Sequence, residues 1–232
     1  FKSNVEDIGQ SAALEAKTLA EMGGDLLPQR LRSDHPLTND ADRQSPMRVV
    51  LMGRTMAGKS SILAALSGSH HERIGDGRQR FSRDVVCAPT TISTDIEVVD
   101  TPGVGAYGGA DDTEVAIKAA LAADVILWVN SSDSIQQESA ASLKLLGVIG
   151  KPIIVALNCR QSLEGVGRLN LMRFPDRVFG NKDGLIDEIR RHLAEAGVNP
   201  IAIVYVHALA AAEALSHDEL DKELHDASRI TD

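Results

Sequence analysis

Aromatic residues are scarce in this chain of 232 residues, which has one Trp, two Tyr and four Phe. Its core must be filled mainly by Leu, Ile, Val and Ala, and a base-stacking surface for single-stranded nucleic acid is not expected. Positive charge is also in the minority, because 24 Lys and Arg stand against 33 Asp and Glu and give a formal net charge of −9. Such a chain repels phosphate backbones, so we predict no direct binding to nucleic acid.

Cysteines are few and long apolar runs are missing. The two cysteines, Cys87 and Cys159, cannot make a disulfide framework or a cysteine metal cluster and are expected to be reduced thiols. No apolar run approaches the roughly 20 residues of a membrane span, and the first residues lack the pattern of a signal peptide. We therefore expect a cytoplasmic protein, in which any membrane contact would come from regions outside this chain.

Composition and periodicity predict four segments. Residues 1–27 contain apolar side chains at helical spacing and are expected to form an amphipathic helix. Residues 28–46 are polar, contain three prolines and are expected to be a linker. A compact domain is expected over residues 47–215, followed by a helical tail at 216–232 that we expect to be cut short.

Strand and helix patterns alternate within the compact domain. Five short apolar runs are expected to be strands, at 47–52, 96–99, 125–129, 153–157 and 201–206. Helical patterns lie between them, at 60–66, 112–122, 136–149 and 184–196. Strands that alternate with helices predict an α/β fold of three layers, with helices on both faces of a mostly parallel sheet.

A glycine-rich motif follows the first expected strand. Residues 53–60 match the P-loop pattern G-x-x-x-x-G-K-[ST] at every fixed position. The motif lies between a strand and a helix, which directs backbone N–H groups and the positive end of the helix toward a polyphosphate. Lys59 is expected to contact the β- and γ-phosphates and Ser60 to bind Mg²⁺. The remaining expected contacts in this loop are Arg54, Thr55, Met56, Ala57, Gly58 and Ser61.

A second motif, Asp100-Thr101-Pro102-Gly103, follows the next expected strand. Ligands of open parallel sheets bind at the carboxyl ends of the strands, so Asp100 should lie beside the P-loop. Its carboxylate is suited to holding Mg²⁺ through water. Gly103 offers a backbone N–H to the γ-phosphate.

With Pro89-Thr90-Thr91 between them, these two motifs resemble the GTPase domain of the translation-factor-related class, in its Era/TrmE-like and dynamin-like branches. The resemblance covers residues 47–215 and implies a P-loop fold that binds GTP, GDP and Mg²⁺. It also implies a switch threonine that completes the metal shell. Either Thr90 or Thr91 could fill that role, and the pattern favours Thr91. The short distance from Thr91 to Asp100 means that the second strand is shortened or lies before the threonines, at 81–87.

The base-recognition motif departs from the family. Where the resemblance expects N-K-x-D, this chain has Asn158-Cys159-Arg160-Gln161. Gln161 replaces the carboxylate that prefers guanine, so we expect a weakened preference for guanine over adenine. At the last motif the resemblance places His207 and Ala208 at the base, with the Ala208 N–H facing the guanine O6. Asn158 is either a brace of the site or a simple strand-end cap.

The catalytic positions depart as well. Val104 stands where related enzymes place a water-orienting Gln, so hydrolysis by the isolated chain is expected to be slow. Met56 replaces the Asn of potassium-activated relatives, so K⁺ activation is not expected. The loop 68–88 contains Arg73, Arg78, Arg80 and Arg83, one of which could act as an arginine finger in cis or across a homodimer. A solvated loop is the plainer interpretation of those arginines.

The sequence therefore predicts a slow, Mg²⁺-dependent GTPase that acts as a conformational switch, completed by a homodimer or an activating protein. One alternative is a dynamin-like mechanochemical or scaffolding GTPase whose helical stalk is absent. Another is an NTPase with relaxed base specificity. A P-loop kinase fits less well, because D-T-P-G with upstream threonines is typical of a switch.

Overall fold

The computed structural model describes residues 45–69, 71–74, 85–104, 110–131, 146–147, 150–180, 183–216 and 220–230. The helix and linker expected over residues 1–44 lie outside this part of the chain. So does most of the helix expected over 136–149, of which Leu146 and Gly147 are described and helical. Among the helices of the described residues, none is long and apolar enough to cross a bilayer.

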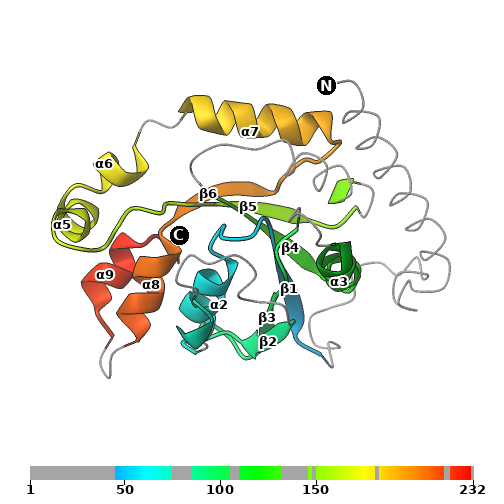
Figure 1. Cartoon of the computed structure of the whole chain (residues 1–232), viewed down its shortest axis with the longest axis horizontal. Helices are drawn as coiled ribbons and strands as arrows, with labels where there is room; N and C mark the ends of the chain where they lie inside the picture. Colours follow the sequence, from blue (N-terminus) through cyan, green and yellow to red (C-terminus); the bar gives the residue numbers. More distant parts are fainter. Residues whose placement is uncertain are drawn as a thin grey trace. The chain divides into compact units, whose positions relative to one another are not determined.

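Six strands form one sheet in the order β2-β3-β1-β4-β5-β6 (Figure 1). Their bounds are β1 Met47–Met52, β2 Val86–Pro89, β3 Ile96–Asp100, β4 Val125–Ser131, β5 Ile153–Asn158 and β6 Ala202–Val206. All neighbours are parallel except β2, which pairs antiparallel with β3. The expected α/β fold with a mostly parallel sheet is confirmed. The carboxyl ends of the parallel strands share one edge, which is where the functional motifs follow.

The position of β2 resolves an alternative that the sequence left open. The strand lies before the two threonines, and its register pairs Val86 with Asp100 and Pro89 with Glu97. The chain therefore enters β2 at the carboxyl end of β3 and leaves it at the amino end. The threonines that follow Pro89 therefore lie near the amino end of β3, whereas Asp100 lies at its carboxyl end.

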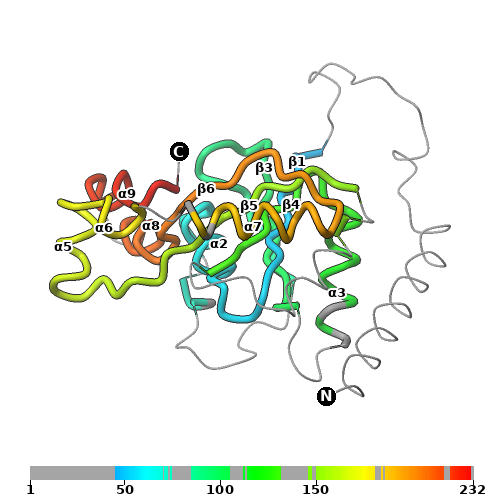
Figure 2. Tube along the Cα trace, turned by 90° about the horizontal axis from the view of Figure 1, so that it is seen from above, coloured from blue at the N-terminus to red at the C-terminus, as the bar shows by residue number. Residues whose placement is uncertain are grey.

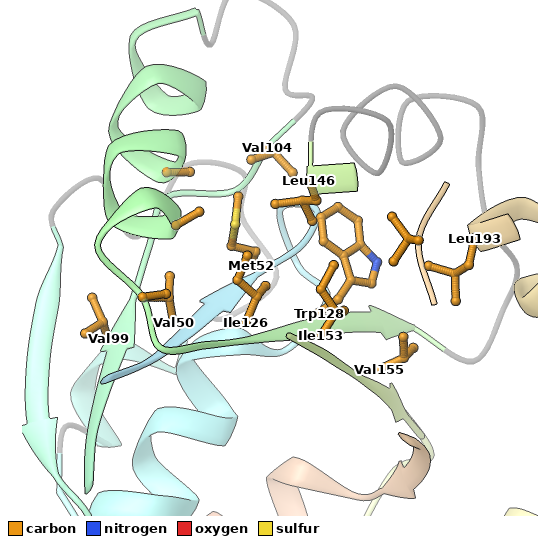
Figure 3. Packing of buried hydrophobic residues seen from close by; sticks show 14 of the residues in the cluster. Val50, Met52, Val99, Val104, Ile126, Trp128, Leu146, Ile153, Val155 and Leu193 are labelled. Atoms are coloured by element: carbon orange, nitrogen blue, oxygen red, sulfur yellow. The ribbon is translucent and has the colours of Figure 1, made fainter. Parts of the chain in front are cut away.

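Helices cover both faces of the sheet. One face packs against α2 (Lys59–Ser67) and α8 (Ala208–Leu215), and the other against α3 (Ala110–Leu121) and α7 (Asp183–Glu195). The second face holds the larger apolar cluster, centred on the buried Trp128 among aliphatic side chains (Figure 3). Alanines let α2 and α8 approach closely, because Ala64 and Ala65 meet Ala211 and Ala212. These packed layers hold the strand ends in fixed positions.

Helices extend the domain beyond β6 (Figure 2), and a third apolar cluster lies among them. It joins α5 (Val166–Arg173), α6 (Pro175–Phe179), α8 and α9 (Lys222–Ala227). The segment between β5 and α7 thus contains two helices, α5 and α6. The boundary drawn at residue 215 separates α8 from α9, although these two pack together and Leu224 of α9 is fully buried. One short 3-10 helix, η3, spans His71–Arg73.

Candidate functional site

The loop between β1 and α2 has the backbone that a phosphate cradle requires. Gly53 and Gly58 have φ angles of 145° and 102°, in the region that side chains rarely adopt. A Cβ on Gly53 would overlap the Val129 carbonyl, and one on Gly58 would overlap the Asn158 amide. Gly58 caps α2 without a side-chain hydrogen bond. The first turn of α2, with Ser60 and Ser61, therefore opens onto this loop with its N–H groups.

Lys59 is held beneath the loop by main-chain oxygens. Its Nζ donates to the carbonyls of Gly53 at 3.1 Å and Arg54 at 2.9 Å, and the residue is only 6% exposed. Burial lowers the pKa of Lys59 to about 8, against the opposing attraction of the Asp100 carboxylate. The ammonium is thus fixed in position beneath the loop, and an incoming phosphate would stabilise its charged form.

Ser60 and Asp100 meet as the sequence predicts. The Ser60 hydroxyl donates to Asp100 Oδ2 at 2.8 Å, and Asp100 is fully buried at the end of β3. Hydroxyl and carboxylate oxygens are hard donors that suit Mg²⁺. Within the described ranges no cluster of three or more His, Cys, Asp or Glu could enclose a metal. A site of this kind fits Mg²⁺, which uses one or two protein oxygens together with substrate phosphates.

The prediction that Thr91 is a metal ligand is wrong. Its N–H and its hydroxyl both donate to the Leu66 carbonyl, at 2.8 and 3.2 Å, in the last turn of α2. Ser60 lies in the first turn of the same helix, so the length of α2 separates the two residues. Thr90 instead closes the β2–β3 turn, with its hydroxyl bonded to the Ser93 carbonyl at 2.9 Å. The strand before the threonines, one of the two alternatives drawn from the sequence, makes them the turn of the β2–β3 hairpin.

The D-T-P-G segment is tied to the phosphate loop at several points. Thr101 donates its hydroxyl to the Leu51 carbonyl at 2.7 Å, and the Val104 N–H donates to the Gly53 carbonyl at 3.1 Å. A Cβ on Gly103 would overlap Thr55, so Gly103 lies directly against the loop. Val104 is 2% exposed and belongs to the apolar cluster around Trp128. Its side chain points into the core, away from any bound phosphate.

Asn158 braces the site and is not a simple cap. Its Nδ2 donates to the Ala57 carbonyl at 2.9 Å, and its Oδ1 accepts from the Ala208 N–H at 3.0 Å. The side chain therefore connects the phosphate loop to the start of α8. The Ala208 N–H, expected to face the guanine O6, is already used by Asn158, so that prediction is corrected.

His207 is also placed differently from the prediction, because its imidazole is buried in the protein. The residue is 1% exposed, and both ring nitrogens bond to main-chain groups of Ala210 and Gln161. Gln161 itself is exposed, and Cys159 is buried in the cluster with α5 and α6. The side chain of Cys159 therefore packs away from the nucleotide loop, whereas Gln161 stays available to a base.

Other expected contributors fall into two groups. Arg78, Arg80, Arg83 and residues 105–109 lie outside the described part of the chain. Arg168 bonds to Glu213 and Asp221, both at 2.6 Å. It fastens α5 to α8 and α9. Phe174 is half-exposed at the end of α5, with the Arg177 guanidinium 4.4 Å above its ring.

Comparison with known proteins agrees with this geometry. Residues 48–159 match the family model described as 50S ribosome-binding GTPase. Translation initiation factor IF-2 of Vesicomyosocius okutanii subsp. Calyptogena okutanii (strain HA) is 27% identical over 161 residues. That match covers 66% of this chain and 17% of the initiation factor.

Solved structures share the fold. A variant of Aquifex aeolicus Era bound to GDP.AlF4- superposes with a TM-score of 0.53 at 22% identity, over 71% of this chain and 52% of that one. A mutant of S. thermophilus NFeoB bound to GMPPNP gives a TM-score of 0.51 at 21% identity, over 75% and 65% of the two chains. The chain thus spans about half of the Era structure. It carries the match to the 50S ribosome-binding GTPase model in residues 48–159 and shares its fold with these GTPase structures.

Proposed function

We propose that this protein binds GTP and GDP and hydrolyses GTP with Mg²⁺, acting as a conformational switch. The observation that carries the proposal is the contact between Ser60 and Asp100, 2.8 Å apart, beside the buried Lys59. Two motifs that are 40 residues apart in the chain meet there. The family match and the Era and translation-factor relatives favour this switch over the dynamin-like alternative.

Each residue of the phosphate site has a role in this proposal. Lys59 pairs with the β- and γ-phosphates, and the Gly103 N–H binds the γ-phosphate. Ser60 and Asp100 would hold Mg²⁺, which neutralises the phosphate oxygens when bound. A structure of Era in complex with MgGDPNP supports the choice of this metal. Since Thr91 lies at the far end of α2 from Ser60, it is not a metal ligand in this proposal.

Base recognition in this proposal depends on Gln161 and on the start of α8. The Gln161 amide oxygen accepts one hydrogen bond from the guanine edge, where a carboxylate would accept two with charge. Because the Ala208 N–H is used by Asn158, the next amide, that of Leu209, would have to donate to the guanine O6. Guanine is therefore preferred over adenine, by a smaller margin than a carboxylate gives.

Hydrolysis is expected to be slow without a partner. The Val104 side chain lies in the core and orients no water, so the attacking water must be placed by another group. Missing transition-state groups in this fold cost factors of about 10³ to 10⁵ in rate. We propose that a second copy of the chain or an activating protein supplies them. Turnover per protein molecule would then rise with protein concentration.

The cellular setting follows from composition and remains part of the proposal. We propose a cytoplasmic location, in keeping with two cysteines that are expected to be reduced thiols. We propose no direct nucleic-acid partner, because the net charge is −9. One Era structure contains nucleotides of 16S ribosomal RNA, and that binding is a property of Era. A filter-binding assay with this RNA segment would test the assignment, which predicts no retention at physiological salt.

The deciding experiment is isothermal titration of the chain with GDP, GTPγS, ADP and ATPγS, each in Mg²⁺ and in EDTA. The proposal predicts binding of both guanine nucleotides, tighter in Mg²⁺ for GTPγS, and weaker binding of the adenine pair. Equal affinity for GDP and ADP would show that the protein is a general NTPase and not a GTPase. Phosphate release from GTP, followed at several protein concentrations, then measures the slow turnover.

A further inference from the structure

We propose that His207 is the positioning residue of the base-recognition loop 158–161, and that its imidazole holds this loop in register with α8. This inference rests on the proposed function, because it concerns how the same site selects its base. The observation behind it is that a buried imidazole spans two segments that are 46 residues apart and bonds to the main chain of each.

The two ring nitrogens make different contacts. Nδ1 accepts from the Ala210 N–H at 3.3 Å and caps the first turn of α8. Nε2 lies 3.0 Å from the Gln161 carbonyl oxygen. Because a carbonyl only accepts and an amide N–H only donates, the ring must be neutral with its proton on Nε2. The His207 side chain therefore donates to the loop and accepts from the helix at once.

The surroundings of His207 make this link rigid. The His207 N–H donates to the Ser228 carbonyl at 2.9 Å, and the Cys159 N–H donates to the Val206 carbonyl at 2.8 Å. Burial lowers the pKa of His207, so the neutral ring is the stable form. With the start of the loop held by Asn158 and Cys159, the ring is what fixes the main chain at Gln161. Gln161 is the residue whose side chain replaces the missing carboxylate.

Two substitutions separate the two contacts. In His207→Asn, the asparagine Oδ1 takes the place of Nδ1 and keeps the cap of α8, since Asn is a favourable N-cap. The shorter side chain does not reach Gln161, so the hydrogen bond to its carbonyl is lost. In His207→Gln, the side-chain amide reaches as far as Nε2 and can donate to the Gln161 carbonyl, whereas the cap is lost. If His207 had only a structural role, the nucleotide affinity of each variant would fall in proportion to its loss of melting temperature.

The experiment titrates the full chain and both variants with GDP, ADP and inorganic pyrophosphate in Mg²⁺, and records their melting temperatures. We expect His207→Asn to melt close to the parent and to bind GDP roughly 3- to 10-fold more weakly, the value of one hydrogen bond, with pyrophosphate unchanged. Its preference for GDP over ADP should shrink. His207→Gln should melt lower and keep the parent ratio of GDP to pyrophosphate affinity.

Equal GDP affinity in the parent and in folded His207→Asn would overturn the inference and leave the proposed function intact. A parallel loss of GDP and pyrophosphate affinity would also overturn it, because that pattern reports general destabilisation. If His207→Asn does not fold, His207→Gln provides the test. A ratio of GDP affinity to pyrophosphate affinity that is much lower in His207→Gln than in the parent would then overturn the inference. A parent chain that binds no GDP would overturn the proposed function, and the inference with it.

Discussion

The two halves of the nucleotide site are built differently. The phosphate half consists of residues 53–60 and 100–104, and the base half of residues 158–161 and 206–209. In the phosphate half every fixed motif position is present, and the two segments bond to each other through Ser60 and Val104. In the base half Asn158 keeps its expected place, whereas His207 and the Ala208 N–H bond to the protein instead of facing a base. Binding of a nucleotide and choice of its base are therefore separable properties of this chain.

The difference has a physical basis. Phosphate binding needs backbone N–H groups and a buried cation in one geometry, so it depends on glycine φ angles and close contacts that admit few residues. Base recognition depends on one or two side-chain hydrogen bonds at an exposed position, and these can change without disturbing the fold. Substitutions in the two halves should therefore have effects of different size and selectivity.

The largest effect is expected from Lys59→Ala. Affinity for GDP, GTPγS and ADP should all fall about 100-fold or more, since charged hydrogen bonds are each worth about 1.5–3 kcal/mol. The fold should persist, because among the described residues the ammonium bonds to two loop carbonyls, and because it is costly to bury. Titration together with circular dichroism checks both points. Unchanged affinity in a folded variant would refute the assignment of the phosphate half.

The second prediction compares two hydroxyls at opposite ends of one helix. Ser60→Ala should weaken Mg²⁺-dependent binding of GTPγS by about 10- to 100-fold, because a metal ligand is lost. Thr91→Ala is the matched control and should change the affinity less than about twofold, since its hydroxyl only bonds to the Leu66 carbonyl. Titrations in Mg²⁺ and in EDTA measure both. A Thr91→Ala defect as large as that of Ser60→Ala would contradict the placement of Thr91.

The third prediction addresses the base half alone. Gln161→Asp should tighten GDP binding by about 1–3 kcal/mol, because a carboxylate accepts charge-assisted hydrogen bonds from the guanine edge. ADP and pyrophosphate affinities should not improve. Competition titrations of the parent and the variant give the three values. An equal gain for ADP would show that position 161 does not face the base edge.

The fourth prediction concerns pH. Without nucleotide, burial lowers the pKa of Lys59 to about 8. A bound phosphate would raise this pKa, so GDP binding above about pH 8 should be coupled to the uptake of a proton. Affinity should be nearly level below about pH 8 and then fall by up to about tenfold per pH unit. Titration in buffers of different ionisation enthalpy would detect the proton uptake. Affinity that stays level far above that pH would mean that the ammonium keeps its charge without a ligand.

The smallest effect is expected from monovalent ions. Met56 offers no oxygen to a cation, so replacing Na⁺ by K⁺ at constant ionic strength should leave GTP turnover nearly unchanged. Turnover in matched chloride salts measures this. A several-fold rise in K⁺ would show that another group supplies the ligand.

Local patterns made the phosphate half predictable. The strand ends, the glycines and the pairing of Ser60 with Asp100 follow from a motif with fixed spacing in a parallel sheet. Thr91 was misplaced because the direction of β2 depends on its antiparallel pairing with β3, which no local signal at the threonines reveals. His207 was misplaced because its ring bonds to Gln161 and Ala210, contacts that exist only after β5, β6 and α8 have assembled.

The ratio of GDP to ADP affinity for the unmodified chain in Mg²⁺ is the sharpest test of the separation between the two halves. Both nucleotides should bind, because the phosphate half recognises what they share. GDP should bind more tightly, by a smaller margin than in Gln161→Asp, where the carboxylate is expected to add roughly 1–3 kcal/mol. A chain that binds GDP with full guanine selectivity, and gains nothing from Gln161→Asp, would show that the two halves are not separable.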